Sequence, residues 1–316
     1  MIGAAVRRLG WTVVVVWFVV TATFLMVAVI PADPARALLG PHADAPALAR
    51  VRAHYCLDRG VVAQYGCWLD RLAHGDLGES YRTKRAVTEI LADRIGPTAE
   101  LALAAIVLQL LIGVPLGILA AVRRGRWPDL AASLAGLIGL SAPPFFVGTA
   151  VLYLFAYRWG WFPLSGDGHG TGVAGRLAHL VLPAATLAAA GVAYYARVVR
   201  GELGEVLGAD YVRTARAKGL PERTVVGRHA LRNALGPLVT LVGLDLGVLL
   251  GGAVVIELIF AWPGLGRELL QAILELDLPL IVGVVIVTAV AIAVANLIAD
   301  LVLVWIDPRL RDPEAA

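Results

Sequence analysis

The stretch LPLIVGVVIVTAVAIAVANLIADLVLVWI, residues 278–306, contains no Lys, Arg or Glu. A helix needs roughly 20 mostly apolar residues to cross the hydrocarbon core of a membrane. This stretch is long enough, so it predicts a transmembrane helix. The stretch carries the amide Asn296 and the acid Asp300, and we expect them to act as helix–helix hydrogen-bonding groups or as interfacial caps.

Five other stretches meet the same criterion, so the sequence predicts an all-α membrane protein with six transmembrane helices. A signal peptide is the alternative for the first stretch. Its apolar run of about 22 residues exceeds the 7–15 typical of such a peptide, which favours a retained helix. The other five spans lie at about 9–30, 101–122, 130–157, 177–199 (interrupted by Pro183) and 235–260 (carrying Asp245).

Composition agrees with a membrane protein. Hydrophobic residues make up 59% of the 316 residues, charged residues 16%, and the mean hydropathy is +0.77. Soluble domains are nearer 45–50% apolar and about 25% charged, so this composition excludes an ordinary soluble enzyme and a disordered chain. The small net charge of +3 is spread over several loops, so we expect membrane lipid and no nucleic acid as a partner.

The Lys and Arg residues predict the orientation. With the N-terminus inside, the cytoplasmic segments hold fifteen of the 27 Lys and Arg residues, and the two short outer loops hold three. The remaining nine lie in the long segment 31–97, which is left out because long loops translocate largely regardless of charge. We therefore expect both termini in the cytoplasm of a bacterium, with the chain in its cytoplasmic (inner) membrane.

Three regions follow from this topology: residues 1–30 as the N-terminus and first span, 31–97 as an extracytoplasmic scaffold, and 98–316 as the membrane core. The scaffold segment is too small and too polar to predict an independent core for it, so we expect it to lie against the membrane helices. Cys56 and Cys67 both fall in it, on the oxidising side, which makes a disulfide between them plausible. Two unpaired residues are the alternative.

The cytoplasmic loop at about 200–234 is basic but lacks the Gly, Ser and Pro enrichment of a flexible linker. It predicts two short helices around a turn. Gly219 would end the first helix in the left-handed conformation, and Pro221 suits the start of the second. A protein-docking element and a simple basic loop are both compatible with this composition.

The residues DYVRTARAKGL (210–220) and RHALRNA (228–234) resemble the cytoplasmic loop of ABC-importer permeases, in the dipeptide/oligopeptide/nickel branch. The general motif is Glu-Ala-Ala, three residues, then Gly. Alignment on Gly219 places Arg213, Thr214 and Ala215 at the first three positions, a departure that this branch itself tends to show. The resemblance continues, in order, through GDLGES (75–80), ELIFAWPGLG (257–266), Asn296-Leu297, Asp300 and DPR (307–309).

The resemblance covers essentially the whole chain and implies a type I importer-like permease. It implies as partners a second, similar permease subunit, two cytoplasmic ATPase subunits and an extracytoplasmic solute-binding protein. The loop would be the coupling helix that docks in a cleft of the ATPase. The residues that would carry this contact are Tyr211, Arg213, Thr214, Ala215, Lys218, Gly219 and Leu220.

The resemblance also places the fifth span beside the translocation path. A charge within a membrane is costly and is a functional candidate by default, so Asp245 is expected to line the path, with pairing to a neighbouring helix as the alternative. Gly247 and Gly251 continue a small-residue stripe there, for which tight helix packing is the alternative. The outer gate or binding-protein docking face would include Glu257, Trp262, Pro263 and Gly264, near the outer surface.

This chain is not expected to be an enzyme or to bind a cofactor or metal itself. A phosphate-cradling loop needs Gly-Lys followed by Ser or Thr, and the only lysines, Lys84 and Lys218, follow Thr83 and Ala217. ATP and Mg would therefore be used by the partner ATPases. The sequence predicts an ATP-driven peptide importer; a nickel or other small-solute importer, a proton-coupled secondary transporter and a membrane-embedded enzyme are the alternatives.

Overall fold

The computed structural model describes residues 2–29, 34–39, 43–127, 129–130 and 141–306. These residues form helices, and apart from an isolated bridge between Glu79 and Ala86 the described ranges contain no β-structure. Four of the helices are long and apolar enough to cross a membrane, and a fifth span results if one bent helix pair is counted as a single crossing. The chain is therefore an all-helical protein with several candidate membrane spans.

The long helices match four of the expected spans. They are α1 (Ile2–Val29), α5 (Val87–Leu108) continued through the π-helical turn η1 (Gln109–Gly113) into α6 (Val114–Val122), α9 (Gly172–Val206) and α16 (Leu278–Ile306). The bent pair joins residues 222–234 to α13 (Gly236–Gly252) at 48° and is followed by α14 (Val254–Ile259). The third expected span lies partly at 131–140, outside the described residues. Its described part is α8 (Pro144–Val151) with the π-helical η2 (Leu152–Arg158).

Two boundaries differ from the expectation. The second long helix begins at Val87 rather than near Leu101, because its polar outer turns are matched by partners from other helices instead of lipid. The fourth helix is not interrupted at Pro183, which lies buried inside the continuous α9. Proline removes a single backbone donor, and the surrounding helix continues past it.

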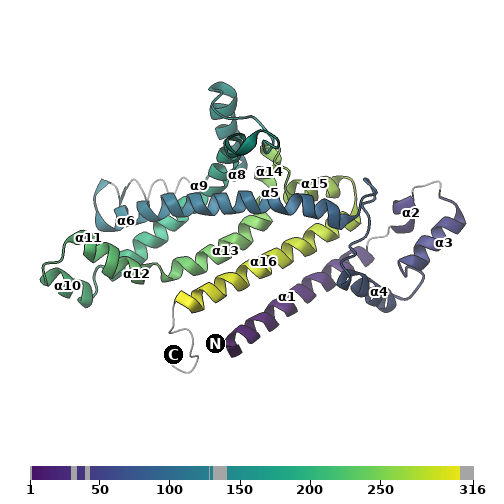
Figure 1. Ribbon diagram of the computed structural model, residues 1–316, viewed down its shortest axis with the longest axis horizontal. Helices are drawn as coiled ribbons and strands as arrows, with labels where there is room; N and C mark the ends of the chain where they lie inside the picture. Colours follow the sequence, from purple (N-terminus) through teal and green to yellow (C-terminus); the bar gives the residue numbers. More distant parts are fainter. Residues whose placement is uncertain (1, 30–33, 40–42, 128, 131–140, 307–316) are drawn as a thin grey trace.

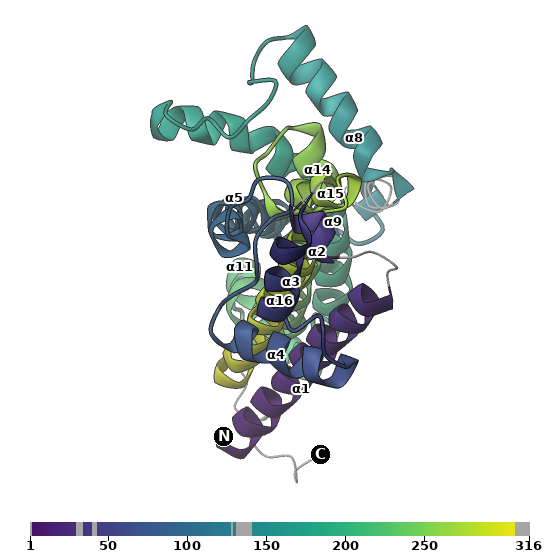
Figure 2. The same cartoon turned by 90° about the vertical axis from the view of Figure 1, so that its right-hand side faces the viewer.

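The long helices lie side by side (Figure 1). α1 packs on α16, α16 on α13, and α13 on α5, while α9 packs against α5 and α6. The segment α8–η2 packs on α9 and α14 at its base, and its far end projects away from the other long helices (Figure 2). The start of α1, the helices α10–α12 and the end of α16 lie toward one end of the molecule, and α2–α4 and α15 lie toward the other (Figure 1).

The segment between α1 and α5 contains α2 (Pro34–Leu39), α3 (Ala45–His54) and α4 (Val61–Ala73). α4 packs Trp68, Leu69 and Leu72 against Val20 of α1 and against α16. The Tyr65 and Thr21 hydroxyls also lie 2.6 Å apart. Helix α4 thus rests on α1 and α16 and does not form a core of its own.

Candidate functional site

A helix–turn–helix element surrounds Gly219. α10 (Asp210–Ala217) ends there, and the chain restarts after Pro221 as α11 (Glu222–Thr224), the π-helical η3 (Val225–Ala230) and α12 (Leu231–Ala234). Gly219 has φ +75°, a left-handed conformation that glycine adopts without strain. Its N–H donates to the Arg216 carbonyl at 2.9 Å. The predicted helix–glycine–helix shape is therefore confirmed.

One face of α10 is buried against its own subunit. Val212 is fully buried and Ala215 is 7% exposed, and both pack on Leu203 of α9 and on Val225 and Ala230. Ala215, which was expected among the docking residues, is therefore a packing residue. Its small side chain lets α10 lie close to η3 and fixes the position of the exposed face.

The opposite face of α10 and the turn are exposed. The Arg213 guanidinium is 74% exposed, and its approach to Asp210 is a loose 3.7 Å. An exposed ion pair of this kind contributes little to stability, so Arg213 is available to a partner. The other exposed members of the expected set are Tyr211, Thr214, Lys218, Gly219 and Leu220.

Two polar contacts hold the element in shape, and neither was singled out from the sequence. The Arg216 guanidinium donates to both oxygens of Glu222, at 3.2 and 2.6 Å, across the turn at Gly219. This hydrogen bond holds the pKa of the Glu222 carboxyl below its usual range and raises the pKa of Arg216. The Asn233 amide donates to the Tyr211 hydroxyl at 2.9 Å. The sequence did contain a signal for the Arg216–Glu222 contact, namely opposite charges on the two sides of the turn at Gly219.

The loop after α14 is organised around a buried carboxylate. Glu257 is fully buried and accepts hydrogen bonds from the Thr98 hydroxyl at 2.7 Å and the Arg267 N–H at 2.9 Å. The Trp262 ring is also fully buried, and its Nε1–H donates to the Pro97 carbonyl at 2.9 Å. Both residues were expected near the outer surface, as part of a gate or a docking face. In the structure both side chains turn inward, because α5 supplies polar partners there.

Gly264 is part of the same packing. A Cβ at this position would lie 2.1 Å from Oε1 of Glu257, so only glycine allows the carboxylate to sit against the loop. Pro263 beside it is half-buried. The residues 257–264 are therefore fixed against the N-terminal part of α5 by buried contacts.

The glycines of α13 pack against α16. A Cβ on Gly243 would lie 2.0 Å from the Ala299 Cβ, and one on Gly247 would lie 3.1 Å from Ile292. Gly247 is buried in this helix interface and does not open to a path, so the tight-packing interpretation holds for it. Gly251 belongs to α13, and its surroundings lie outside the described part of the structure.

Asp245 is half-buried on α13 and faces the Tyr195 hydroxyl of α9. Tyr195 is fully buried, and its hydroxyl lacks a hydrogen bond of regular geometry to any described residue. Gln109 of η1 is 2% exposed, and its Oε1 is likewise unpartnered among the described residues. Sequence reasoning found Asp245 but not the two buried polar side chains from the neighbouring helices.

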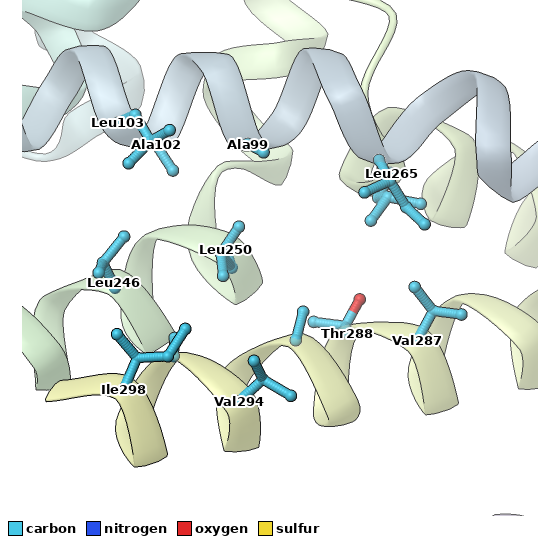
Figure 3. Close-up of a pocket in the computed structure, with 13 residues that line it drawn as sticks. Ala99, Ala102, Leu103, Leu246, Leu250, Leu265, Val287, Thr288, Val294 and Ile298 are labelled. Atoms are coloured by element: carbon cyan, nitrogen blue, oxygen red, sulfur yellow. The ribbon is translucent and has the colours of Figure 1, made fainter. Parts of the chain in front are cut away.

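An apolar crevice of about 310 Å³ lies between α5, α13 and α16. Figure 3 shows Leu246 and Leu250 of α13 reaching between Ala102 and Leu103 of α5 and the side chains of α16. Thr288 supplies the only polar side chain among the thirteen that line it. Asp245 does not line this crevice, whose walls suit hydrocarbon and not a charged solute.

The segment between α1 and α5 is held to the loop between α15 and α16 by Asp277, which is 1% exposed. Its carboxylate accepts from the Ser80 hydroxyl at 2.5 Å and from the Tyr81 N–H at 3.0 Å. Within the segment, Cys56 and Cys67 are joined by a disulfide. No group of three or more metal-ligating side chains occurs within the described ranges.

Comparisons with known proteins agree with this arrangement. Residues 113–312 match the family model described as binding-protein-dependent transport system inner membrane component, and residues 1–102 match the model of its N-terminal part. A glutathione transport system permease protein of Salmonella choleraesuis is 38% identical over 98% of this chain and 99% of its own length. A putative peptide transport system permease protein of Brucella abortus is also 38% identical, with the same coverage.

A solved structure has a similar fold. The inward-facing MetNI methionine ABC transporter contains a chain that matches with a TM-score of 0.58 and 18% identity, over 69% of this chain and 96% of that one. At this identity the likeness concerns the fold. The family models together with relatives that match from end to end establish that this chain belongs to the binding-protein-dependent transport system inner membrane components, the permeases of ABC importers.

Proposed function

We propose that this chain is one permease subunit of an ATP-driven importer that moves di- or oligopeptides across the cytoplasmic membrane by alternating access. The observation that carries the proposal is the exposed, rigid element around Gly219, on a chain of the importer-permease family. In this proposal the chain crosses the membrane six times, with both termini in the cytoplasm. The third crossing would comprise α8–η2 and the residues before it.

The relatives support a peptide as the solute. They are named for glutathione, itself a tripeptide, and for peptides, whereas nothing in the described part of the chain gathers the ligands of a nickel site. Solute choice in such importers lies largely with the solute-binding protein, which would dock on the outer end near residues 257–266. Glu257, Trp262 and Gly264 would act there by holding the loop, and Pro263 by shaping it.

The energy for transport would come from ATP hydrolysis by other subunits. Two ATPase subunits would use ATP and Mg, and this chain would receive their motion through Tyr211, Arg213, Thr214, Lys218, Gly219 and Leu220. A lever must not bend, and the buried Val212 and Ala215 with the Arg216–Glu222 pair supply that stiffness. The second permease subunit would complete the path, and lipid would cover the rest of the apolar surface.

The test is isolation of the tagged chain from native membranes in mild detergent, followed by uptake measurements. We expect it to bring down a second permease, two ATPase subunits and a solute-binding protein. Reconstituted in liposomes, the complex should accumulate trialanine only with ATP. Recovery of the chain alone in several detergents, or uptake that follows a proton gradient without ATP, would instead support the secondary-transporter alternative.

A substitution adds a specific readout. Gly219→Asp should leave the complex expressed and inserted, because nothing lies within 4 Å of a Cβ at this position. It should nevertheless abolish uptake, since the acidic side chain protrudes into the proposed contact with the ATPase. Normal uptake by a well-expressed Gly219→Asp complex would show that this element does not couple transport to ATP.

A further inference from the structure

Asp245 lies at the border between the core and an open face of α13. Leu244 and Val248 are 55% and 66% exposed, and Leu249 is 7% exposed. Asp245 falls between these two faces on the helix, and its side chain is half-buried. It is about ten residues, or roughly 15 Å, from the start of α13 at 1.5 Å per residue. This depth is about the middle of a 30 Å hydrocarbon core.

The carboxylate has no basic partner among the described residues. Its recorded polar neighbour is the Tyr195 hydroxyl. The Tyr195 hydroxyl has no hydrogen bond of regular geometry to a described residue, so its oxygen can still accept one. A carboxylate in the middle of a membrane without a counter-charge is costly, and it is stabilised when a cation approaches.

Gln109 adds a third oxygen on the same helix seam. Its carboxamide lies against Gly191, where a Cβ would come 2.1 Å from Nε2 of Gln109. Gly191 is one turn before Tyr195 on α9, and a Cβ on Gly113, one turn after Gln109, would lie 2.9 Å from the Tyr195 Cβ. The buried Oε1 of Gln109 has no partner in the described structure. A buried acceptor without a partner is destabilising, so it too is stabilised when a donor approaches.

We propose that Asp245, Tyr195 and Gln109 form a subsite midway across the membrane that binds the primary ammonium group of a passing solute. An ammonium group carries a positive charge and three N–H donors, which complement a carboxylate, a hydroxyl oxygen and a carboxamide oxygen. Every peptide with a free N-terminus carries such a group. This inference rests on the proposed function, because a permease must pass the solute along this face of α13.

Binding is tested first, with a probe that needs no transport. The purified complex is placed in lipid nanodiscs, and the unfolding temperature of this chain is followed with methylammonium chloride, tetramethylammonium chloride or sodium chloride at equal concentration. Methylammonium should raise the unfolding temperature above that in either other salt, because tetramethylammonium has the charge but no N–H donor. Binding to the folded state alone stabilises it by mass action.

Variants assign the effect to the subsite. Asp245→Asn should abolish the methylammonium-specific shift, and Tyr195→Phe should reduce it. Leu244→Asn is the matched control, since it adds the same amide to the neighbouring exposed position and should keep the full shift. An equal shift in Asp245→Asn, or no specific shift in the unaltered complex, would overturn the proposal.

Uptake separates this inference from the importer itself. In proteoliposomes, Asp245→Asn should lower trialanine uptake at least tenfold while binding-protein-stimulated ATP hydrolysis persists. If the unaltered complex takes up trialanine and Asp245→Asn does so equally well, the subsite is refuted and the importer stands. If the unaltered complex fails to transport, the proposed function fails, and the methylammonium measurement still decides whether the subsite exists.

Discussion

The same substitution at two exposed glycines of the helix–turn–helix element should have opposite effects on stability. Gly219 has φ +75°, whereas Gly227, in η3, lies in helical backbone; a Cβ at either position would have nothing within 4 Å. Neither alanine variant therefore meets a steric clash. The difference between them isolates the backbone conformation.

The magnitudes follow from the two conformations. An L-residue in the left-handed region costs roughly 1–2 kcal/mol, and alanine recovers about 0.4–1 kcal/mol by restricting the unfolded chain. Gly219→Ala should thus destabilise by about 0.5–1 kcal/mol. Gly227→Ala should stabilise by about 0.5–1 kcal/mol, because glycine is unfavourable within a helix by that amount. The two variants should differ by roughly 1.5 kcal/mol.

The assay is the unfolding temperature of this chain in the detergent-solubilised complex, followed through a fluorescent tag on the chain during size-exclusion chromatography. At roughly 2–4 °C per kcal/mol for chains of a few hundred residues, the two variants should be separated by on the order of 4 °C. Gly227→Ala should lie above the unaltered chain and Gly219→Ala below it. A shift of the same sign in both variants would refute the assignment of a left-handed turn at Gly219.

Three further predictions concern other contacts. Glu222→Gln should lower the unfolding temperature only at pH values where Glu222 is ionised. Because the pKa of Glu222 is lowered in the folded chain, its stabilisation is present above about pH 4.3 and is lost as the pH falls through the lowered pKa. The unfolding temperatures of the variant and the unaltered chain should therefore converge in acid. Gly264→Ala should destabilise by about 1–3 kcal/mol, because its Cβ would lie 2.1 Å from Oε1 of Glu257; an unchanged unfolding temperature would contradict the packing described for the outer loop. Cys56 and Cys67 are the only cysteines of the chain, so unfolded protein should take up maleimide only after reduction, and labelling without reductant would mean that the bridge is absent.

The helix–turn–helix element around Gly219 was predictable because the residues that determine it are neighbours in the sequence. Gly219 follows a helix-compatible run and precedes Pro221, and the turn forms there with the expected backbone. Local order also suggested which face of α10 is free, with Ala215 as the exception. The type of a small residue in a short amphipathic helix does not indicate whether its side chain packs inward or faces a partner.

The outer end of α5 was not predictable in the same way. Hydropathy treats each residue separately, so a stretch with Arg94 and Thr98 resembles a loop. The partners of these side chains, Glu268 and Glu257, lie more than 150 residues away along the chain. Only the folded structure shows that the charges and hydroxyls satisfy one another and that the helix continues. The burial of Trp262 was missed for the same reason, since its partner is a backbone carbonyl of that helix.

These contacts at the outer end of α5 limit how the molecule can change shape. Arg94 is bound to Glu268, Thr98 to Glu257 and to the Leu265 N–H, and Glu100 to Arg176. These contacts connect the N-terminal part of α5 to α9, α14 and α15, so we expect these ends to move together. The π-helical turn η1, which begins at Gln109, is where α5 departs from regular helix after these contacts. In the proposed importer, we therefore expect a switch between inward and outward access to pivot at or below η1, with the loops beyond it moving together.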